Sequence, residues 1–324
     1  MFTFRFDMRS PATSPASTTD LYQAALDMAS WGEEHGVVSM MVSEHHHASD
    51  GYLPSPLVLA SALAARTREV PIQVGALLAP LHDPIRLAED IAVLDNLSRG
   101  RVAYILAVGY RPEEYAMLGR DYSKRGQLMD ECIEAMRQAW SGEAFTYQGR
   151  PVLMATRTMT PGGPTLFMGG HSKPAVRRAA RYGMGVMTEG NTGLEEFYKA
   201  ECANYGTEPQ MFVDPGPGTV SSAFIAEDPD AAWEEYGPHL LHDALMYAEW
   251  MGEHQQAITH SASATVEALK AEQGNYRIFT PDEAVAYVRE HGLLSLQPLC
   301  GGLPPDLAWK SLELLAAKVL PQLG

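Results

Sequence analysis

The feature that most constrains the fold of this chain is a repeated succession of apolar strand, polar turn and helix. Runs of strand length recur eight times, at residues 2–8, 37–42, 72–79, 102–108, 165–168, 185–188, 220–226 and 293–299. Helical patterns are predicted at 20–35, from 55, from 83 to about 97, from 112, at 123–140, after 170, from 280 and at 305–319. Strands that alternate with helices in this way predict a parallel sheet covered by helices.

The starts of several predicted helices carry the residues that cap a helix. Ser55-Pro56 and Asp83-Pro84 each place a polar N-cap residue before a proline at the first helical position, where the missing proline N–H costs nothing. Thr280-Pro281-Asp282-Glu283 has the spacing of a capping box. These signals fix the starts of three helices independently of the apolar pattern.

A doubly wound sheet and a (β/α)8 barrel both fit this pattern. Eight units with no break in composition at a domain linker favour the TIM barrel, as one domain over residues 1–324. Two stretches depart from the repeat. Residues 141–165, with Gly, Pro and Thr, are predicted to form an inserted hairpin. Residues 230–273 are predicted to be helical throughout, and could form a substrate lid or simply pack as ordinary helices.

The balance of charge and the cysteines exclude several classes of function. The chain has 24 Lys and Arg against 40 Asp and Glu, a net charge of −16, so we expect no nucleic-acid partner and no membrane partner. Cys132, Cys202 and Cys300 are widely spaced, which argues against both a disulfide framework and a structural zinc site. Without a secretory signal pattern at the start of the chain, we expect a soluble cytoplasmic protein.

The ends of the predicted strands carry the chemistry that a barrel would use, because barrel active sites lie at the carboxyl ends of the strands. The second strand is followed by Glu44-His45-His46-His47. Alternation puts His45 and His47 on one side, with Glu44 and His46 on the other. A histidine there can serve as general acid or base, metal ligand or cofactor-facing donor, or can hydrogen-bond the loop backbone. The fourth strand is followed by Gly109-Tyr110-Arg111-Pro112.

The fifth strand ends in Gly169-Gly170-His171-Ser172, directly before a helix. Glycines let backbone N–H groups approach a phosphate, and a serine with the positive end of the helix completes an anion site. An ordinary tight turn is the alternative interpretation. Neither a GxGxxG pattern nor a GxxxxGKS/T pattern occurs, so a dinucleotide-binding fold and a nucleotide-triphosphate loop are unsupported.

Segments around these strand ends resemble the bacterial luciferase-like family of flavin-dependent oxidoreductases. The specific similarity lies within residues 37–126, in VSEHHHASDGYLPSPLVLASALAART, VGALLAPLHDPIRLAEDIAVLDNLSRGR and VGYRPEEYAMLGRDYSKRG. PTLFMGGHSKPAVRRAARYG is similar to the family's phosphate-binding turn, and LCGGLPPDLAWKSLELLAAKVLP to its C-terminal unit. The resemblance implies a (β/α)8 barrel that binds reduced FMN or the deazaflavin F-420, often as a homodimer.

The resemblance also assigns residues. His45 matches the family's catalytic histidine, and Ala76-Leu77-Leu78 the segment behind the flavin, where the family often has a non-prolyl cis peptide. Ala107 takes the place of a cysteine near the flavin in luciferase, and Val108 replaces an arginine, so phosphate binding rests elsewhere, with Arg111 among the candidates. The expected cofactor-binding residues are Ala76, Leu77, Ala107, Gly109, Gly169, Gly170, His171, Ser172 and Arg177.

The sequence therefore predicts a luciferase-like monooxygenase that uses reduced FMN and O2 on a small organic substrate, with a flavin reductase as partner. An apolar floor of Leu77, Leu78, Ala107 and Val108 would exclude water, and His45 would move the proton. Hydride transfer with F-420 is the first alternative, because the same phosphate turn serves either cofactor.

Two alternatives belong to other classes of protein. One is a non-catalytic partner subunit that keeps the fold. The other is a metal-dependent barrel hydrolase with His45, His47, His82 and Asp83 as ligands. Such hydrolases generally carry His-x-His on the first strand and a carboxylate on the eighth, whereas this chain has Asp7-Met8 and Gln297 to Cys300 there. No metal ligand is therefore assigned.

Overall fold

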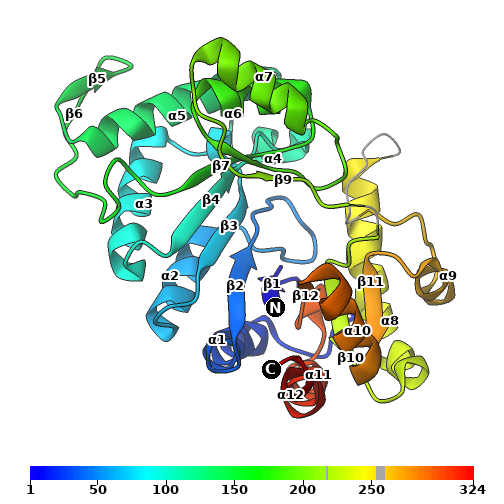
Figure 1. Ribbon diagram of the computed structural model, residues 1–324. Helices are drawn as coiled ribbons and strands as arrows, with labels where there is room; N and C mark the ends of the chain where they lie inside the picture. The colour runs from blue at the N-terminus through cyan, green and yellow to red at the C-terminus, as the bar shows by residue number, and fades with distance from the viewer. Residues whose placement is uncertain (217, 253–259) are drawn as a thin grey trace. The chain divides into compact units, whose positions relative to one another are not determined.

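The computed structural model describes residues 1–216, 218–252 and 260–324 (Figure 1). Contacts within the chain divide it into two compact units, which are described in turn. Unit 1 consists of Met1–Met41, Ala48–Leu53 and Gly216–Gly324, and unit 2 of Val42–His47 and Pro54–Pro215.

Unit 1 is built on a sheet with the strand order β11-β10-β12-β1-β2. Its strands are β1 (Phe2–Phe6), β2 (Val37–Val42), β10 (Ser222–Ile225), β11 (Tyr276–Phe279) and β12 (Leu294–Leu296). The pairs β1 with β12, β10 with β12 and β10 with β11 are parallel. Its helices are α1 (Thr18–Glu34), α8 (Pro229–Met251), α9 (Val266–Glu272), α10 (Pro281–His291), α11 (Pro305–Leu314) and α12 (Leu320–Leu323), with the helical turns η3 (Cys300–Gly302) and η4 (Leu315–Val319).

Unit 2 is built on a parallel sheet with the strand order β3-β4-β7-β8-β9. Its strands are β3 (Ile72–Leu77), β4 (Val102–Leu106), β7 (Leu166–Gly169), β8 (Gly185–Met187) and β9 (Phe212–Val213). Its helices are α2 (Pro56–Arg66), α3 (Pro84–Ser98), α4 (Pro112–Met117), α5 (Arg125–Ser141), α6 (Lys173–Arg181) and α7 (Glu195–Tyr205), with the short turns η1 (Ala79–Leu81) and η2 (Tyr122–Lys124). Helices α2, α3 and α5 lie side by side (Figure 1).

All eight predicted strands are present, and the predicted hairpin within 141–165 is confirmed. It is the antiparallel pair β5 (Phe145–Tyr147) and β6 (Arg150–Val152). Two of the three predicted caps are confirmed, whereas Ser55, which precedes α2, makes no side-chain capping hydrogen bond. Asp83 accepts hydrogen bonds from the amides of Ile85 and Arg86, and Thr280 with Glu283 forms the capping box. Two strands were not predicted, β9 and β11, because runs of two and four residues carry too little periodicity to distinguish from a loop.

The prediction that residues 230–273 are helical throughout is wrong. Helix α8 ends at Met251, α9 begins at Val266, and 260–265 is not helical; residues 253–259 lie outside the described part of the chain. The side chains of this segment explain the break, because serine and threonine hydroxyls compete with helical hydrogen bonds. Ser261 and Ser263 bind the Glu272 carboxylate, and Thr265 caps α9 at the amide of Ala268.

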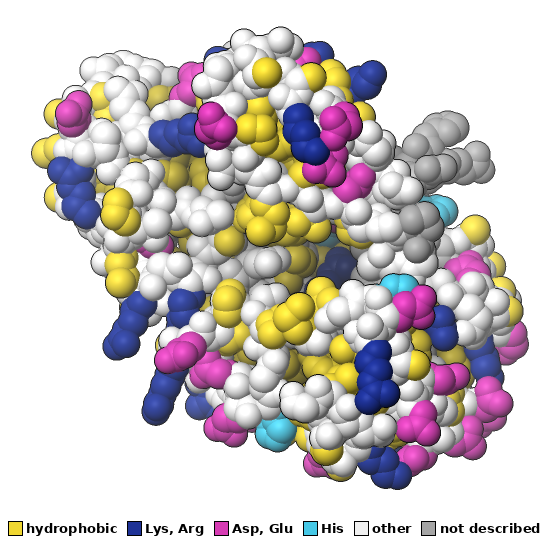
Figure 2. Space-filling model, in the orientation of Figure 1, with side chains coloured by type: hydrophobic (Ala, Val, Ile, Leu, Met, Phe, Trp, Pro, Cys, Tyr) yellow, Lys and Arg dark blue, Asp and Glu magenta, His cyan; other side chains and the backbone are white. Residues whose placement is uncertain are grey.

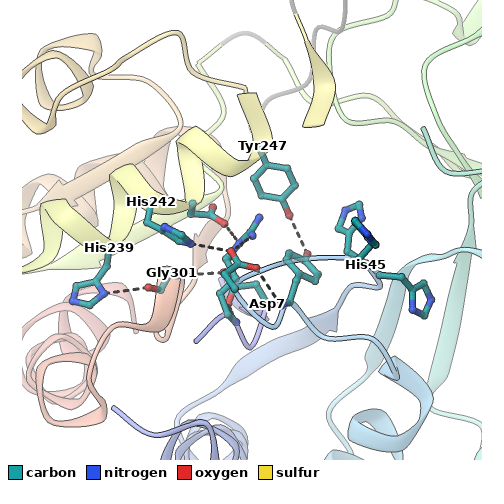
Figure 3. Close-up of polar contacts among 12 residues, drawn as sticks. Asp7, His45, His239, His242, Tyr247 and Gly301 are labelled. Atoms are coloured by element: carbon teal, nitrogen blue, oxygen red, sulfur yellow. Dashed lines mark hydrogen bonds and ion pairs between the residues drawn. The ribbon is translucent and has the colours of Figure 1, made fainter. Parts of the chain in front are cut away.

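The interior of unit 1 contains a fully buried arginine surrounded by carboxylates. Arg9 Nε donates to Asp243 Oδ1 at 2.7 Å, and Arg9 Nη1 donates to Asp50. Asp7 lies next to the same guanidinium, 3.7 Å from Nε. His242 Nε2 contacts Asp50 at 2.9 Å, and Figure 3 shows how α8 brings His242 and Tyr247 to this cluster. These ion pairs connect α8 to the segments that follow β1 and β2.

Hydrogen bonds and ring contacts within the cluster offset the free-energy cost of removing its charged groups from water. The guanidinium carbon of Arg9 lies 4.6 Å from the ring centre of Tyr52, 5.0 Å from that of Tyr247 and 4.5 Å from that of Trp250, distances at which rings attract a cation. Burial and the nearby Asp243 carboxylate raise the pKa of Asp7 to about 6, against the opposing pull of Arg9. Buried charges of this kind stabilise the fold only as a complete set.

The surface combines both signs of charge. On the face in Figure 2, basic and acidic side chains are interspersed, as in the ion pairs Arg86–Asp90 and Lys199–Glu196. Within the described ranges, none of the helices has the length and apolar character required to cross a bilayer.

Gly185 tests the packing of β7 against β8. A Cβ atom at residue 185 would lie 2.6 Å from the Phe167 ring and 2.9 Å from the carbonyl oxygen of Met211. We therefore expect Gly185→Ala to lower the free energy of unfolding by about 1–3 kcal/mol, the usual cost of overpacking. Urea denaturation followed by circular dichroism measures this. In the control Gly274→Ala the new Cβ meets nothing closer than 3.9 Å, and an equal loss in both variants would contradict the packing argument.

Candidate active site

The candidate site lies at one edge of the sheet of unit 2. Strands β3, β4 and β7 are parallel neighbours, so their carboxyl ends meet at the same edge. The segment Ser43 to His47 follows β2 and binds the end of β3, since the amide of Glu44 donates to the carbonyl oxygen of Ala76 at 3.1 Å. The predicted histidine segment and the predicted phosphate turn after β7 therefore share one edge.

Glu44 is a buried carboxylate of this edge that accepts three hydrogen bonds. One oxygen, Oε1, accepts from His46 Nε2 at 2.9 Å and from His82 Nε2 at 2.8 Å. The other, Oε2, accepts from the amide of Leu78 at 2.6 Å. The side chain is 1% exposed, so it depends on these donors for the stabilisation that water would otherwise give. Glu44 and His46 do meet on one side of the chain, as alternation predicts.

These contacts determine the charge of Glu44. Burial by itself would raise the pKa of this carboxyl, but the hydrogen bonds from His46, His82 and Leu78 outweigh it and lower the pKa to about 2. For His82, burial would lower the pKa, and the Glu44 carboxylate overcomes that effect and raises it. Glu44 is therefore an anion at neutral pH, and it favours the protonated form of His82.

The segment expected behind the flavin is held by residues of the β2 end. The Ser43 hydroxyl donates to the carbonyl oxygen of Gly75, next to the non-prolyl cis peptide Gly75-Ala76. The cis bond thus falls at the place that the resemblance implies. Ala76 is half-buried, whereas Leu77 is completely buried. Of these two, only Ala76 has exposed surface to offer a ligand.

His45 is paired with a second buried carboxylate, Glu114 of α4. His45 Nδ1 lies 2.8 Å from Glu114 Oε1, and the Glu114 side chain is completely buried. The amide of His46 donates to the same oxygen at 3.0 Å. Because a carboxylate only accepts, Nδ1 carries the hydrogen of this bond, and Nε2 of the neutral ring is an acceptor.

Arg111 braces the histidine segment from the other side. Its Nη1 donates to the carbonyl oxygen of His46 at 2.6 Å, and Nη2 to that of His47 at 3.1 Å. Nη1 also lies 3.4 Å from Glu114 Oε1. Arg111 is buried, so these contacts favour a structural role over the phosphate contact expected from the sequence. His47 has a φ of +50°, and its side chain is exposed.

The role of Glu114 was not predicted from the sequence. Glu114 belongs to the segment that carries the resemblance, but the sequence does not distinguish it from its neighbour Glu113 as the carboxylate that binds His45. The distinguishing signal is helical geometry. Pro112 begins α4, and the structure buries Glu114 while Glu113 stays exposed. Which of two adjacent acids faces inward depends on the start of a six-residue helix, and periodicity alone cannot define so short an element.

The turn after β7 contains two glycines, and a different physical constraint favours glycine at each position. A Cβ at Gly169 would lie 3.0 Å from the Ile105 side chain, so the close approach of β4 excludes a side chain there. Gly170 has a φ of +118°, and a Cβ would touch only Ala175, at 3.5 Å. His171 and Ser172 are exposed, and the Ser172 hydroxyl caps α6 by accepting from the amide of Ala175 at 3.4 Å.

Arg177 lies one helical turn into α6 and faces α7. Its Nε is 3.3 Å from Glu201 Oε2, and its guanidinium lies over the Phe197 ring. Through these contacts Arg177 connects helix α6 to helix α7. Lys173, the first residue of α6, has its ammonium group 5.4 Å from the same ring, beside the turn itself.

The expected apolar floor is present in part. Leu78 packs in a cluster with Leu81 and Tyr115, and half-buried Ala107 lies against this cluster. Gly109 follows at the end of β4 with a φ of +71°, and a Cβ there would lie 3.5 Å from Leu78 and 3.7 Å from Glu114 Oε2. The Tyr115 hydroxyl donates to the carbonyl oxygen of Val108.

The ligand set of the hydrolase alternative is not gathered in the structure. His45 binds Glu114, His82 binds Glu44, and Asp83 caps α3. Over the residues that the structure describes, the one group of side chains spaced for a metal ion is Asp7, Asp243 and Cys300. The two carboxylates of that group already contact Arg9.

Glu44 makes the stability of the fold depend on pH in a defined way. Its pKa falls from an ordinary 4.5 to about 2 on folding, so its contribution is complete above pH 4.5 and is lost as the pH falls toward 2. The raised pKa of His82 means that the contribution of this partner is lost as the pH rises through its folded value. We expect the excess stability of the wild type over Glu44→Gln to be greatest between these limits, on the order of 3 kcal/mol.

Urea denaturation of both proteins over a series of pH values measures this difference. The exposed pair Lys199–Glu196 supplies the control variant Glu196→Gln, for which we expect a change below 1 kcal/mol. A wild-type advantage over Glu44→Gln that is independent of pH would contradict the assignment.

Solved structures of similar fold span the whole chain. Monooxygenase RslO1 from Streptomyces bottropensis superposes with a TM-score of 0.78 at 24% identity, over 100% of this chain and 99% of its own. The oxygenating constituent of 3,6-diketocamphane monooxygenase from Pseudomonas putida, in complex with FMN, gives 0.69 at 19% identity, over 99% and 98%. At these identities the likeness concerns the fold, and it confirms the barrel predicted from the strand–helix repeat.

Similarity to curated proteins is shorter. The oxygenase component of the flavin-dependent trigonelline monooxygenase of Acinetobacter baylyi is 30% identical over 125 residues, 38% of this chain and 35% of that protein. The chain spans about half the length or less of the first curated relatives that it matches.

A family comparison covers most of the sequence. The model described as luciferase-like monooxygenase matches residues 2–287. This range includes both carboxylate–histidine pairs and the turn after β7. The chain therefore belongs to the luciferase-like monooxygenase family.

Proposed function

We propose that this protein is the oxygenating component of a flavin-dependent monooxygenase, which uses reduced FMN and O2 on a small organic substrate and receives the reduced flavin from a separate reductase. The observation that carries the proposal is the His45–Glu114 pair at the sheet edge that also bears the turn after β7. The family supports it, as do a relative described as an oxygenase component and a structural neighbour in complex with FMN.

His45 is suited to move a proton at this site. Glu114 accepts from Nδ1 and fixes the tautomer, so Nε2 is the atom that takes up or gives a proton. The His45 side chain is 9% exposed, so a small part of it is open to a ligand while the rest is held by protein contacts. Reduced flavin, when bound, supplies the electrons that activate O2.

The hydrogen-bond donors of the turn after β7 support the binding of the FMN phosphate there. Among the described residues, the amides of His171, Ser172 and Lys173 have no protein acceptor, and the helix start adds a favourable field for an anion. The space around Gly170 is open except toward Ala175. These donors would hold the phosphate, with Lys173 as an adjacent cation.

Exclusion of water is the other task of the protein in this chemistry. The Leu78 cluster and Ala107 form apolar surface close to the His45 segment. The carboxylates of Glu44 and Glu114 are buried, and each has one oxygen in contact with histidine. This apolar surface beside the His45 imidazole limits the access of water to the reacting groups. The substrate class is left to experiment, and the expected homodimer and cytoplasmic location stay predictions.

His45 is the first residue to test. We expect His45→Ala to lower turnover with reduced FMN, O2 and a panel of substrates by about 10²–10⁴-fold, the usual value of a general acid or base. The control is His47→Asn, which alters an exposed side chain of the same segment and keeps a residue that tolerates a positive φ. Equal turnover in wild type and His45→Ala would remove His45 from the reaction.

Ser172 tests the phosphate site. We expect Ser172→Ala to weaken binding of reduced FMN by about 1 kcal/mol or more, about fivefold, because a hydrogen bond to a charged group is lost. Anaerobic titration with reduced FMN and, separately, reduced F-420 measures both affinities, and tighter binding of F-420 would favour hydride transfer instead. Thr265→Ala removes a comparable cap from α9 and is the control, so equal weakening in both variants would contradict a phosphate contact.

A further inference from the structure

We propose that Tyr110 is a positioning residue for His45, and that Glu114, His45 and Tyr110 act as one hydrogen-bonded series. This inference rests on the proposed function, because it assigns to Tyr110 the control of the nitrogen through which His45 exchanges its proton. The Tyr110 hydroxyl lies 3.4 Å from His45 Nε2, the ring atom opposite the one that Glu114 binds. The sequence places Tyr110 at a strand end but gives it no role.

The contact is long for a hydrogen bond, and the surrounding geometry supports it. The rings of His45 and Tyr110 meet edge to face, with centroids 5.6 Å apart and an interplanar angle of 66°. Hydrogen bonds in active sites are commonly long without ligand and shorten when the site is filled.

Tyr110 is also fixed through its own backbone. The Tyr122 hydroxyl donates to the carbonyl oxygen of Tyr110 at 3.2 Å, and Gly109 before it adopts a left-handed turn. Arg111 after it is held by the carbonyl groups of His46 and His47. The phenol therefore stands on a braced loop whose position is set by the same segment that carries His45.

The direction of the hydrogen bond follows from the tautomer. With the hydrogen of the neutral ring on Nδ1, toward Glu114, Nε2 can only accept, so the Tyr110 hydroxyl donates to it. That bond favours the neutral ring, whereas the Glu114 carboxylate favours the protonated ring. Two charged groups of unit 2 belong to or adjoin this series: Glu114 itself, and Arg111, which lies 3.4 Å from the Glu114 oxygen. Tyr110 thus opposes Glu114 and keeps Nε2 ready to accept a proton.

The test compares Tyr110→Phe with wild type by two measurements. NMR titration of ¹⁵N-histidine-labelled protein follows Nε2 of His45, whose signal is assigned by its absence in His45→Gln. We expect the titration midpoint of His45 to rise by about half a unit to one unit in Tyr110→Phe, the equivalent of one hydrogen bond. The pH profile of kcat/KM for oxygenation with reduced FMN should shift to higher pH by the same amount.

Two further variants sharpen the comparison. Tyr205→Phe removes a hydroxyl from an exposed tyrosine on α7 and should move neither the titration nor the profile. Tyr122→Phe releases the backbone of Tyr110 without touching its hydroxyl, and should move the midpoint in the same direction by less. It also keeps the inference testable if Tyr110→Phe folds poorly.

The outcomes separate the inference from the proposed function. An unchanged His45 titration in Tyr110→Phe, in a wild type that oxygenates its substrate, overturns the inference and leaves the function. A shifted titration in a protein that binds reduced FMN but transfers no oxygen overturns the proposed function and leaves the hydrogen bond. A shift in both measurements supports both.

Discussion

A single buried carboxylate, that of Glu44, sets the geometry on which the candidate site depends. It accepts hydrogen bonds from the segment after β2, the end of β3 and the turn before α3, three stretches that are separated along the chain. An anion without water must collect such donors, and satisfying Glu44 therefore fixes where each of those stretches ends. The Ala76 surface and the His45 ring are positioned as a consequence, before any ligand is considered.

The three consecutive histidines have separate tasks because the chain around them is braced at each residue. His46 satisfies Glu44, His45 meets Glu114, and His47 contributes its backbone carbonyl to Arg111. Two carboxylates, those of Glu44 and Glu114, therefore lie at the same edge of the sheet and bind different histidines. Glu44 accepts from the imidazoles of His46 and His82, and Glu114 orients the imidazole of His45. Each carboxylate thereby fixes the orientation of the histidines that it binds.

Much of the fold could be predicted from the sequence, because strand–helix alternation and helix caps are local signals that survive into the folded chain. Asp83 and Thr280 behave as their neighbours predict. What failed was also local: the helix predicted over 230–273 is interrupted at 260–265, where two serines bind the Glu272 carboxylate. In the site, His45 could be predicted and Glu114 could not. Whether an acidic side chain points inward depends on tertiary packing, which the spacing of residues in the sequence does not determine.

The charged interior of unit 1 has a consequence for altering this protein. Arg9 is shared by three aspartates and enclosed by three aromatic rings, and the members come from both ends of the chain. Random mutagenesis aimed at a new specificity would meet severe folding failures here, because removing one member leaves its partners buried and unpaired. A mutant library that keeps residues 7, 9, 50 and 243 constant and varies the residues at the carboxyl edge of the unit 2 sheet would contain fewer variants that fail to fold.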